Sequence, residues 1–218
     1  MIGYPVQLED GQCVLFEGFL GLSEADHYLT DIFQRAYWSQ PEIRVFGKYH
    51  KVPRLSAWYG DADSIYTYSG LTQQPLEWFD TLLTIKNLVQ DETGHGFNSV
   101  LLNYYRDGND GMGRHSDDEA ELGVRPVIAS VSLGQTRRFV FKHRYKASIP
   151  AVSIELTHGS LLLMSGTTQQ FWHHSLPKTR RSIGPRLNLT YRTVFGPQFR
   201  EQQSHLLGKA ERVLRHSN

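Results

Sequence analysis

From about residue 97 onward, apolar and polar positions alternate in short runs that turn residues separate. A period of two is that of a β-strand with one buried face. Because the runs are short and closely spaced, they favour a β-sandwich or barrel over a parallel sheet with crossover helices. The expected strands are 99–105, 127–133, 139–143, 152–156, 161–164, 171–176 and 187–194.

The preceding part of the chain shows the longer period of amphipathic helices. Ser23 and Asp26 have the spacing of a capping box, and residues 29, 32, 33 and 36 form an apolar stripe behind them. Residues 75–90 predict a second helix, with Pro75 at its start and Gly94 beyond its end. We therefore expect a mainly β protein of the α+β class, in which two amino-terminal helices back a β-sandwich. Residues 201–218 read as a polar terminal helix.

Composition adds limits on the class of protein. The 218 residues suit one domain, and the longest purely apolar run, 161–164, is too short for a membrane span. The first residues lack the basic start and apolar stretch of a signal peptide. Cys13 is the only cysteine, so no disulfide within the chain is possible and any metal site must use His, Asp or Glu. We expect a cytoplasmic protein, or a nuclear one in a eukaryote, that is not secreted.

Charge gives only a local signal. The net charge is +1, so the whole chain does not indicate nucleic-acid binding. Three basic clusters are modest candidates for phosphate contact, although such clusters are usually solvated loops. They are residues 44–54, 142–146 and 178–181.

The stretch "MGRHSDDE" raises the question of a metal site. In an extended segment His115 and Asp117 point to the same side, and an imidazole with a carboxylate suits a divalent metal. The third ligand should come from another strand, where His173 and His174 face opposite sides, so that one of them could complete the site. Two histidines and one carboxylate form the facial triad of Fe(II) oxygenases, which leaves coordination positions open. The alternative is a hydrogen-bonded loop with one histidine in the core and one in solvent.

The strand expected at 187–194, taken back to Arg186, favours the metal interpretation. Its polar residues Arg186, Asn188, Thr190 and Arg192 share one face. The run 99–105 likewise presents Asn103 and Tyr105. Together they suit a small dicarboxylate such as 2-oxoglutarate, because guanidinium groups bind carboxylates in bidentate fashion. The alternative is a half-exposed strand whose polar side faces water.

Seven motifs, in order between about residues 45 and 194, carry a family resemblance. They are "VFGKYHKVPR", "YTYSGL", "LLNYYRDGNDGMGRHSDDE", "IASVSLG", "HGSLLLMSG", "WHHSLPK" and "PRLNLTYR". The chain resembles the AlkB family of Fe(II)/2-oxoglutarate-dependent dioxygenases, nearest to the DNA-repair demethylases. The resemblance implies a single domain over 1–218 with a double-stranded β-helix, or jelly-roll, core. It places a nucleotide-recognition region at about 40–75 and the catalytic jelly-roll at about 97–196.

The resemblance also assigns roles to residues. It implies that His115, Asp117 and His174 bind the iron, with His174 chosen because the family's ligand directly precedes the position of Ser175. It implies that 2-oxoglutarate contacts Asn103, Tyr105, Arg186, Asn188 and Arg192, and leaves open which arginine takes which carboxylate. The family's reaction consumes O2 and 2-oxoglutarate, releases succinate, CO2 and formaldehyde, and removes methyl groups from bases such as 1-methyladenine and 3-methylcytosine.

A methyl group on the pairing edge of a base is reached only after the base is flipped out of the duplex. The resemblance implies that Phe46 fills the gap as a wedge and that Tyr68 stacks on the flipped base, with Tyr66 as a nearby hydrogen-bonding group. Asp118 and Glu119 match residues that line the base pocket, where carboxylates suit a cationic base. Arg54 is a candidate for phosphate contact. The alternatives are an aromatic residue buried under a loop and a solvated acidic pair.

Three hypotheses follow from the sequence. The first is a DNA demethylase, and the second is a related enzyme acting on RNA or on a protein side chain. The third is a binding module that recognises alkylated nucleic acid without turnover, which would fit a damaged metal triad. The motifs for the triad and the co-substrate are intact, so the third hypothesis ranks last. The "VFG" motif and Tyr68 argue for a nucleobase, and the first hypothesis is preferred. One flipped-base pocket requires no dimer, so a monomer is expected.

Overall fold

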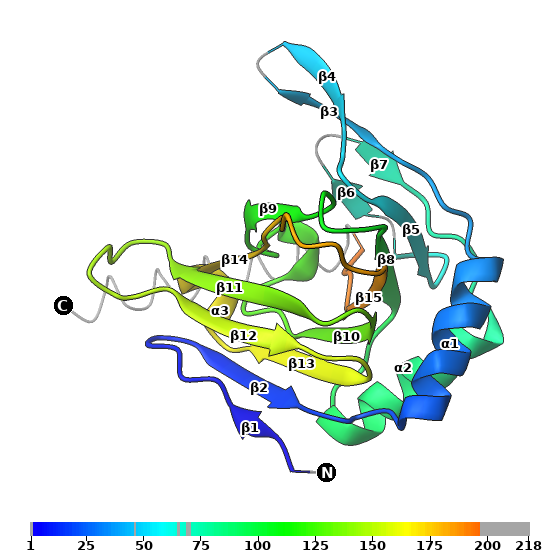
Figure 1. The fold of residues 1–218 in the computed structure, drawn as a ribbon, viewed down its shortest axis with the longest axis horizontal. Coiled ribbons are helices and arrows are strands. Elements are labelled where there is room, and N and C mark those ends of the chain that lie inside the picture. Colours follow the sequence, from blue (N-terminus) through cyan, green and yellow to red (C-terminus); the bar gives the residue numbers. More distant parts are fainter. Residues whose placement is uncertain (1, 46, 65, 69–70, 197–218) are drawn as a thin grey trace, which may run out of the picture.

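The computed structural model describes residues 2–45, 47–64, 66–68 and 71–196, and two antiparallel sheets form its centre (Figure 1). The larger sheet has seven strands, in the spatial order β1 (Tyr4–Pro5), β2 (Gln12–Phe16), β13 (Ser160–Ser165), β10 (Ile128–Gly134), β15 (Arg186–Arg192), β8 (Ser99–Tyr105) and β5 (Leu55–Gly60). The smaller sheet has the order β12 (Val152–Leu156), β11 (Arg137–His143), β14 (Trp172–Leu176) and β9 (Met112–His115).

The chain passes back and forth between these two sheets. It runs from β10 in the large sheet through β11 and β12 in the small one, returns to β13, crosses to β14 and ends in β15. Apolar residues of both sheets pack into one cluster between them, including Phe141 and Trp172 from the small sheet and Leu162 from the large one. This is the jelly-roll core that the sequence predicts, so the expected mainly β, α+β fold is confirmed.

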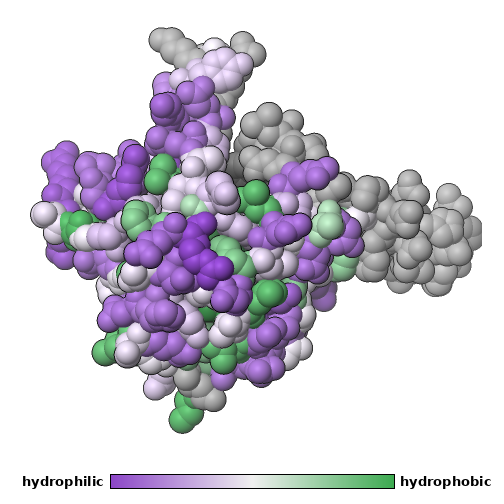
Figure 2. All heavy atoms as spheres, turned by 90° about the vertical axis from the view of Figure 1, so that its right-hand side faces the viewer, coloured by the Kyte–Doolittle hydropathy of each residue, from purple (hydrophilic) through white to green (hydrophobic). Residues whose placement is uncertain are grey.

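Two helices cover the outer face of the large sheet. The helices α1 (Leu22–Arg35) and α2 (Asp80–Thr93) pack against apolar side chains of β8, β10 and β15, and the Tyr191 hydroxyl donates a 3.1 Å hydrogen bond to the Leu82 carbonyl oxygen. Seen from this side, the surface is mostly hydrophilic with scattered apolar residues (Figure 2). None of the helices in the described ranges is long and apolar enough to cross a membrane.

The helix starts differ from the sequence expectation. The first helix begins at Leu22 with Gly21 as its N-cap and no side-chain cap, so the predicted capping box of Ser23 and Asp26 is wrong. Asp26 instead lies 3.2 Å from Nε2 of His158. The second helix begins five residues later than predicted, at Asp80, because the backbone before it is used elsewhere.

Leu76 explains why α2 begins later than predicted. Its backbone forms a parallel bridge with Tyr59 and hydrogen-bonds the edge strand β5, which satisfies groups that a helix would have used. The helix ends at Thr93, three residues beyond the predicted end, and Gly94 follows as its left-handed cap, as the sequence predicts.

The strand expectations agree with the structure to within about two residues, and 99–105 and 152–156 coincide with β8 and β12. At the start of 171–176 the short helix α3 (Thr168–Phe171) includes Phe171, so β14 begins one residue later than predicted. A 3-10 turn covers Ala120–Leu122. Two small hairpins complete the fold, and the first projects from the body: β3 (Glu42–Val45) with β4 (Lys48–Lys51), and β6 (Tyr66–Tyr68) with β7 (Leu71–Gln73) (Figure 1). The predicted helix at 201–218 lies outside the described residues.

Two glycines with similar backbones allow a matched test of the packing between the amino-terminal segment and the sheets. Gly94 and Gly159 both have positive φ, +71° and +74°, but an added Cβ at Gly94 would meet nothing within 4 Å. At Gly159 it would lie 2.6 Å from the Leu20 carbonyl oxygen. We expect Gly94→Ala to lower the free energy of unfolding by about 1 kcal/mol through backbone strain alone. Gly159→Ala should lower it by about 3 kcal/mol, because overpacking adds to that strain. Urea unfolding measures both, and equal losses would contradict this packing.

Candidate metal and co-substrate site

Three predicted metal ligands meet at one end of the small sheet. His115 ends β9, Asp117 follows it by two residues, and His174 lies on β14 directly opposite His115 in the strand register. One potential ligand atom of each lies within 4.8 Å of the others. Within the described ranges this is the one such group of His, Cys, Asp or Glu residues.

The two histidines are oriented for metal binding. Nδ1 of His115 lies 2.9 Å from the Gly113 carbonyl oxygen, which can only accept, so Nδ1 is the donor and Nε2 is the ring nitrogen left to bind a metal. His174 is only 4% exposed and stacks on the Phe139 ring. Burial, helped by the nearby His115, lowers the pKa of His174 to about 3, so this imidazole is uncharged near neutral pH.

Asp117 is held from two directions. Arg192 donates a 2.7 Å hydrogen bond to its Oδ1, and its backbone N–H donates to Oε1 of Gln169. Burial alone would raise the pKa of Asp117, but the positive charge of Arg192 and the neighbouring histidines lower it to about 2. Its second oxygen, Oδ2, lies 3.9 Å from His174 Nε2, which is too far for a hydrogen bond. The ionised carboxylate therefore keeps one oxygen for another partner.

The structure distinguishes the two adjacent histidines by position. His174 points toward His115 and Asp117, whereas His173 faces the other side of the strand. Burial and the charge of Arg144 lower the pKa of His173. The choice of His174 agrees with this geometry, and its role as an iron ligand stays a prediction.

A cavity of about 40 Å³ adjoins the three ligand residues. Its walls carry the predicted co-substrate contacts on β8 and β15, namely Asn103, Tyr105, Arg186, Asn188 and Arg192. Every residue of β15 is buried, and its leucines and tyrosine face the helices. The alternative in which the polar side of this strand faces water is therefore wrong.

Arg186 lies on the wall of this cavity with part of its guanidinium unused. Its Nη2 donates 2.8 Å hydrogen bonds to Ser132 Oγ and Asn188 Oδ1, while its Nε finds no partner among the described residues. Burial lowers the pKa of Arg186 to about 10, so it remains a cation at neutral pH. Burial raises the pKa of Tyr105, which keeps the phenol protonated as a donor. These groups fit an anionic ligand.

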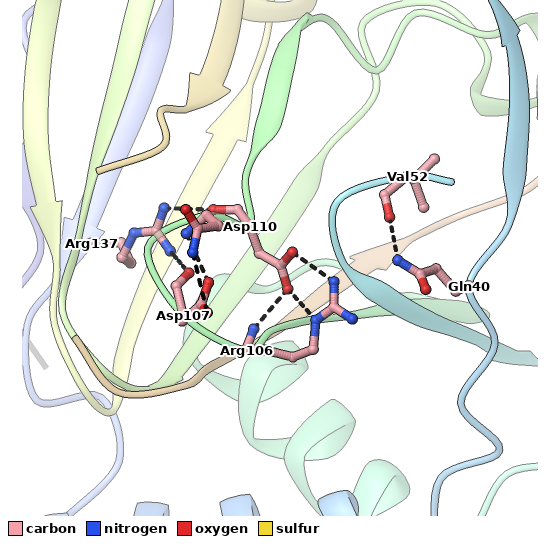
Figure 3. A network of polar contacts seen from close by, with 7 residues as sticks. Gln40, Val52, Arg106, Asp107, Asp110 and Arg137 are labelled. Atoms are coloured by element: carbon pink, nitrogen blue, oxygen red, sulfur yellow. Dashed lines mark hydrogen bonds and ion pairs between the residues drawn. The ribbon is translucent and has the colours of Figure 1, made fainter. Parts of the chain in front are cut away.

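The loop that leads into β9 is fixed by arginines. Arg106 pairs with both carboxylate oxygens of Asp110, and Arg137 donates to the carbonyl oxygens of Asp107, Asp110 and Pro177 (Figure 3). Because these bonds tie residues on both sides of the loop, they set the position from which β9 starts. The strand that carries His115 is thereby anchored at its beginning.

The base-recognition predictions are only partly accessible in the structure. Phe46 and the side chains of Tyr66 and Tyr68 lie outside the described residues. Asp118 is exposed and pairs with Arg144 Nη1 at 2.7 Å, so it is not a simple solvated acid. Glu119 has a buried Oε2 that meets no hydrogen-bond donor in the described part of the chain.

Several site residues were missed by the sequence analysis. Ser130 lines the cavity and donates to Asn188 Oδ1, Gln169 holds Asp117, and Arg144 bonds to Ser116 Oγ. The alternation in 127–133 places Ser130 and Ser132 on one face, which was a usable signal. Arg54, predicted as a surface cation for phosphate, is buried instead, and its Nε donates to Asn103 Oδ1.

Comparisons with known proteins agree with this fold and site. A family model described as the 2OG-Fe(II) oxygenase superfamily matches residues 12–192. The chain is 43% identical over 183 residues to mouse DNA oxidative demethylase ALKBH2, covering 80% of this chain and 77% of that protein. It is 43% identical over 190 residues to human alpha-ketoglutarate-dependent dioxygenase alkB homolog 3, covering 83% of this chain and 65% of that protein. The solved structure of OsALKBH1 covers 87% of this chain and all of its own, with a TM-score of 0.61 at 17% identity.

The chain therefore belongs to the AlkB family of 2OG-Fe(II) oxygenases. It is a dioxygenase whose metal is Fe(II) and whose co-substrate is 2-oxoglutarate. The residues present fit both groups, because two imidazoles and a carboxylate suit Fe(II) and the unused Arg186 Nε suits a carboxylate. The predicted family, fold and cofactors are confirmed.

Metal binding should separate the two adjacent histidines. We expect His174→Ala to weaken Mn(II) binding by more than about 100-fold, since even the loss of an outer-shell partner costs ~10–100-fold. His173→Ala is the matched control and should bind Mn(II) like the unaltered protein. Anaerobic calorimetry with Mn(II), a redox-stable substitute for Fe(II), measures both. Equal losses in the two variants would contradict the assignment of His174.

The buried histidine should also make the metal-free protein sensitive to acid. The pKa of His174 is about 3 in the folded state and near the ordinary histidine value of 6.5 in the unfolded state, so below pH 6.5 the unfolded state binds the extra proton. Stability from this group is therefore complete above pH 6.5 and is lost as the pH falls toward 3. The slope should reach about 1.4 kcal/mol per pH unit. Urea unfolding in a chelator between pH 7 and 5 should show a shallower slope for His174→Leu, and an unchanged slope would exclude this cause.

Proposed function

We propose that this chain is a DNA oxidative demethylase that removes N-methyl groups from bases such as 1-methyladenine and 3-methylcytosine. The observation that carries the proposal is that the His115, Asp117 and His174 cluster adjoins a cavity with a buried, partly unused arginine. The mouse relative named above is a DNA oxidative demethylase, which supports DNA as the substrate. The reaction consumes O2 and 2-oxoglutarate and releases formaldehyde, succinate and CO2.

The roles of the protein side chains follow from their contacts. His115, Asp117 and His174 would hold the iron, which when bound supplies the activation of O2 and the oxidation of the N-methyl carbon. Arg192 orients Asp117 by occupying its Oδ1, so that Oδ2 is presented to the metal. Phe139 restricts the His174 ring by stacking on it. These contacts preorganise the ligands before the metal binds.

We assign the two arginines to different ends of the co-substrate. Arg192 is engaged with Asp117 beside the metal cluster, whereas Arg186 has a free Nε and lies at the other end of β15. Arg186 is therefore the partner of the carboxylate remote from the metal, and Tyr105 donates a further hydrogen bond there. Asn103 and Asn188 bind along the same wall.

We assign base recognition to the region 40–75 together with the loop after Asp117. Phe46 acts as the wedge, Tyr68 stacks on the flipped base and Tyr66 hydrogen-bonds near it. Arg144 already neutralises part of the charge of Asp118, so Glu119 is the freer carboxylate for a cationic base. The jelly-roll at 97–196 carries the catalytic groups.

We further propose that the protein works as a monomer on DNA. One chain supplies all three candidate metal ligands and the whole cavity, so no second copy is required. We expect the protein to be located where DNA is found, which is the cytoplasm, or the nucleus if the organism is a eukaryote.

A duplex with one 1-methyladenine tests the activity directly. In Fe(II), ascorbate and 2-oxoglutarate, the unaltered protein should remove one methyl mass, detected by mass spectrometry of the oligonucleotide. Phe46→Ala should slow demethylation of the duplex by about tenfold or more, because unstacking a duplex base costs a few kcal/mol. Demethylation of the single strand should keep its rate. The same lesion in RNA is the comparison substrate. Faster turnover of RNA than of either DNA would overturn the substrate assignment while leaving the enzyme class intact.

A further inference from the structure

Arg54 is a buried cation with no carboxylate partner among the residues that the structure describes. Its residue is 7% exposed, and its Nε donates a 2.8 Å hydrogen bond to Oδ1 of Asn103. No carboxylate of the described residues forms an ion pair with it. An unpaired buried charge costs desolvation energy that a neutral donor would avoid, so fold stability alone does not explain an arginine at this place.

The hydrogen bond from Arg54 decides how the Asn103 amide is oriented. Because Oδ1 of Asn103 accepts from Arg54, the amide nitrogen Nδ2 must point the other way. Asn103 lines the cavity, and in the described part of the chain no acceptor takes a hydrogen bond from this Nδ2. The amide is thus held as a donor toward an oxygen of a ligand in the cavity.

Arg54 also belongs to the base of the β3–β4 hairpin. The chain leaves β4 through Val52 and Pro53. The Val52 N–H donates a hydrogen bond to the Pro41 carbonyl oxygen, and the Val52 carbonyl oxygen accepts one from Gln40 Nε2 (Figure 3). The Pro53 carbonyl oxygen accepts a hydrogen bond from the N–H of Gly111, the residue just before β9. The hairpin base therefore contacts the strand of the metal ligand and the strand of Asn103.

We propose that Arg54 is a positioning residue for 2-oxoglutarate and couples the β3–β4 hairpin to the co-substrate cavity. It orients Asn103 Nδ2 toward the co-substrate and adds a positive charge near its oxygens. The coupling rests on the proposed function, because it assumes that the β3–β4 hairpin binds nucleic acid. Coupling between two binding sites is reciprocal, so co-substrate in the cavity and DNA on the hairpin raise each other's affinity.

The first measurement uses no nucleic acid. 2-Oxoglutarate is titrated into the full chain loaded with Mn(II), by calorimetry. Arg54→Met, which keeps an unbranched apolar stem and loses the donor, should weaken 2-oxoglutarate binding about tenfold, the cost of one hydrogen bond in a charged site. The affinity for Mn(II) alone should stay unchanged. Lys51→Met, the matched loss of an exposed charge on the same hairpin, should leave 2-oxoglutarate affinity unaltered.

A double-mutant cycle shows whether Arg54 acts through Asn103. In an Asn103→Ala background, Arg54→Met should change the 2-oxoglutarate affinity by less than about twofold, because the group it orients is already gone. Additive losses would show that Arg54 acts independently, which overturns the positioning role. If Arg54→Met does not fold, Arg54→Lys carries the same test, since it keeps the charge and lacks the Nε donor.

The coupling is measured with a labelled duplex that contains 1-methyladenine. With Mn(II) present, 2-oxoglutarate should tighten duplex binding several-fold, and Arg54→Met should abolish this difference. A variant that binds 2-oxoglutarate normally but the duplex weakly would make Arg54 a phosphate contact and overturn the proposal. Failure of the unaltered protein to bind the methylated duplex, with the co-substrate results intact, would instead refute the proposed function.

Discussion

The buried ion pair between Arg192 and Asp117 joins the two halves of the site. Arg192 ends β15, an inner strand of the large sheet, and Asp117 follows β9 of the small sheet, so the 2.7 Å hydrogen bond spans the sandwich. Removing one partner of such a pair leaves an uncompensated buried charge, which costs about 3–5 kcal/mol. The ionised state of Asp117 and the position of its free oxygen both depend on this contact, and with them the metal ligand set.

The alternation of β15 accounts for the rest of the arrangement. Its leucines and Tyr191 pack under the two helices, which turns Arg186, Asn188 and Arg192 inward toward the small sheet. A strand buried on both faces can carry polar residues only if ligands or neighbours satisfy them. Ser132 satisfies part of Arg186, and the remaining donor faces the place where an anionic co-substrate is expected. The same strand thereby supports the fold and forms the wall of the cavity.

Local patterns predicted seven of the strands, β8 and β10 to β15, and the metal cluster, while long-range contacts decided what the sequence could not show. The period of two located β8 and β15, and the His-x-Asp spacing located two ligands, because both signals lie within a few residues. The start of α2 depended on Leu76 bonding to an edge strand, which no local signal reports. Asp117 lies 52 residues from Gln169 and 75 residues from Arg192, and Arg54 lies 49 residues from Asn103, so the burial of these groups followed only from the fold.

The central claim is that the metal cluster and the cavity form a single site, in which the metal and 2-oxoglutarate bind next to each other. Titration of 2-oxoglutarate into the metal-free protein and into the Mn(II)-loaded protein tests it most directly. The account predicts that Mn(II) tightens 2-oxoglutarate binding at least about tenfold, since the co-substrate then has the metal as a further partner, and that 2-oxoglutarate tightens Mn(II) by the same factor. Equal affinities with and without the metal would contradict it, and would mean that the cavity and the three ligands serve separate purposes.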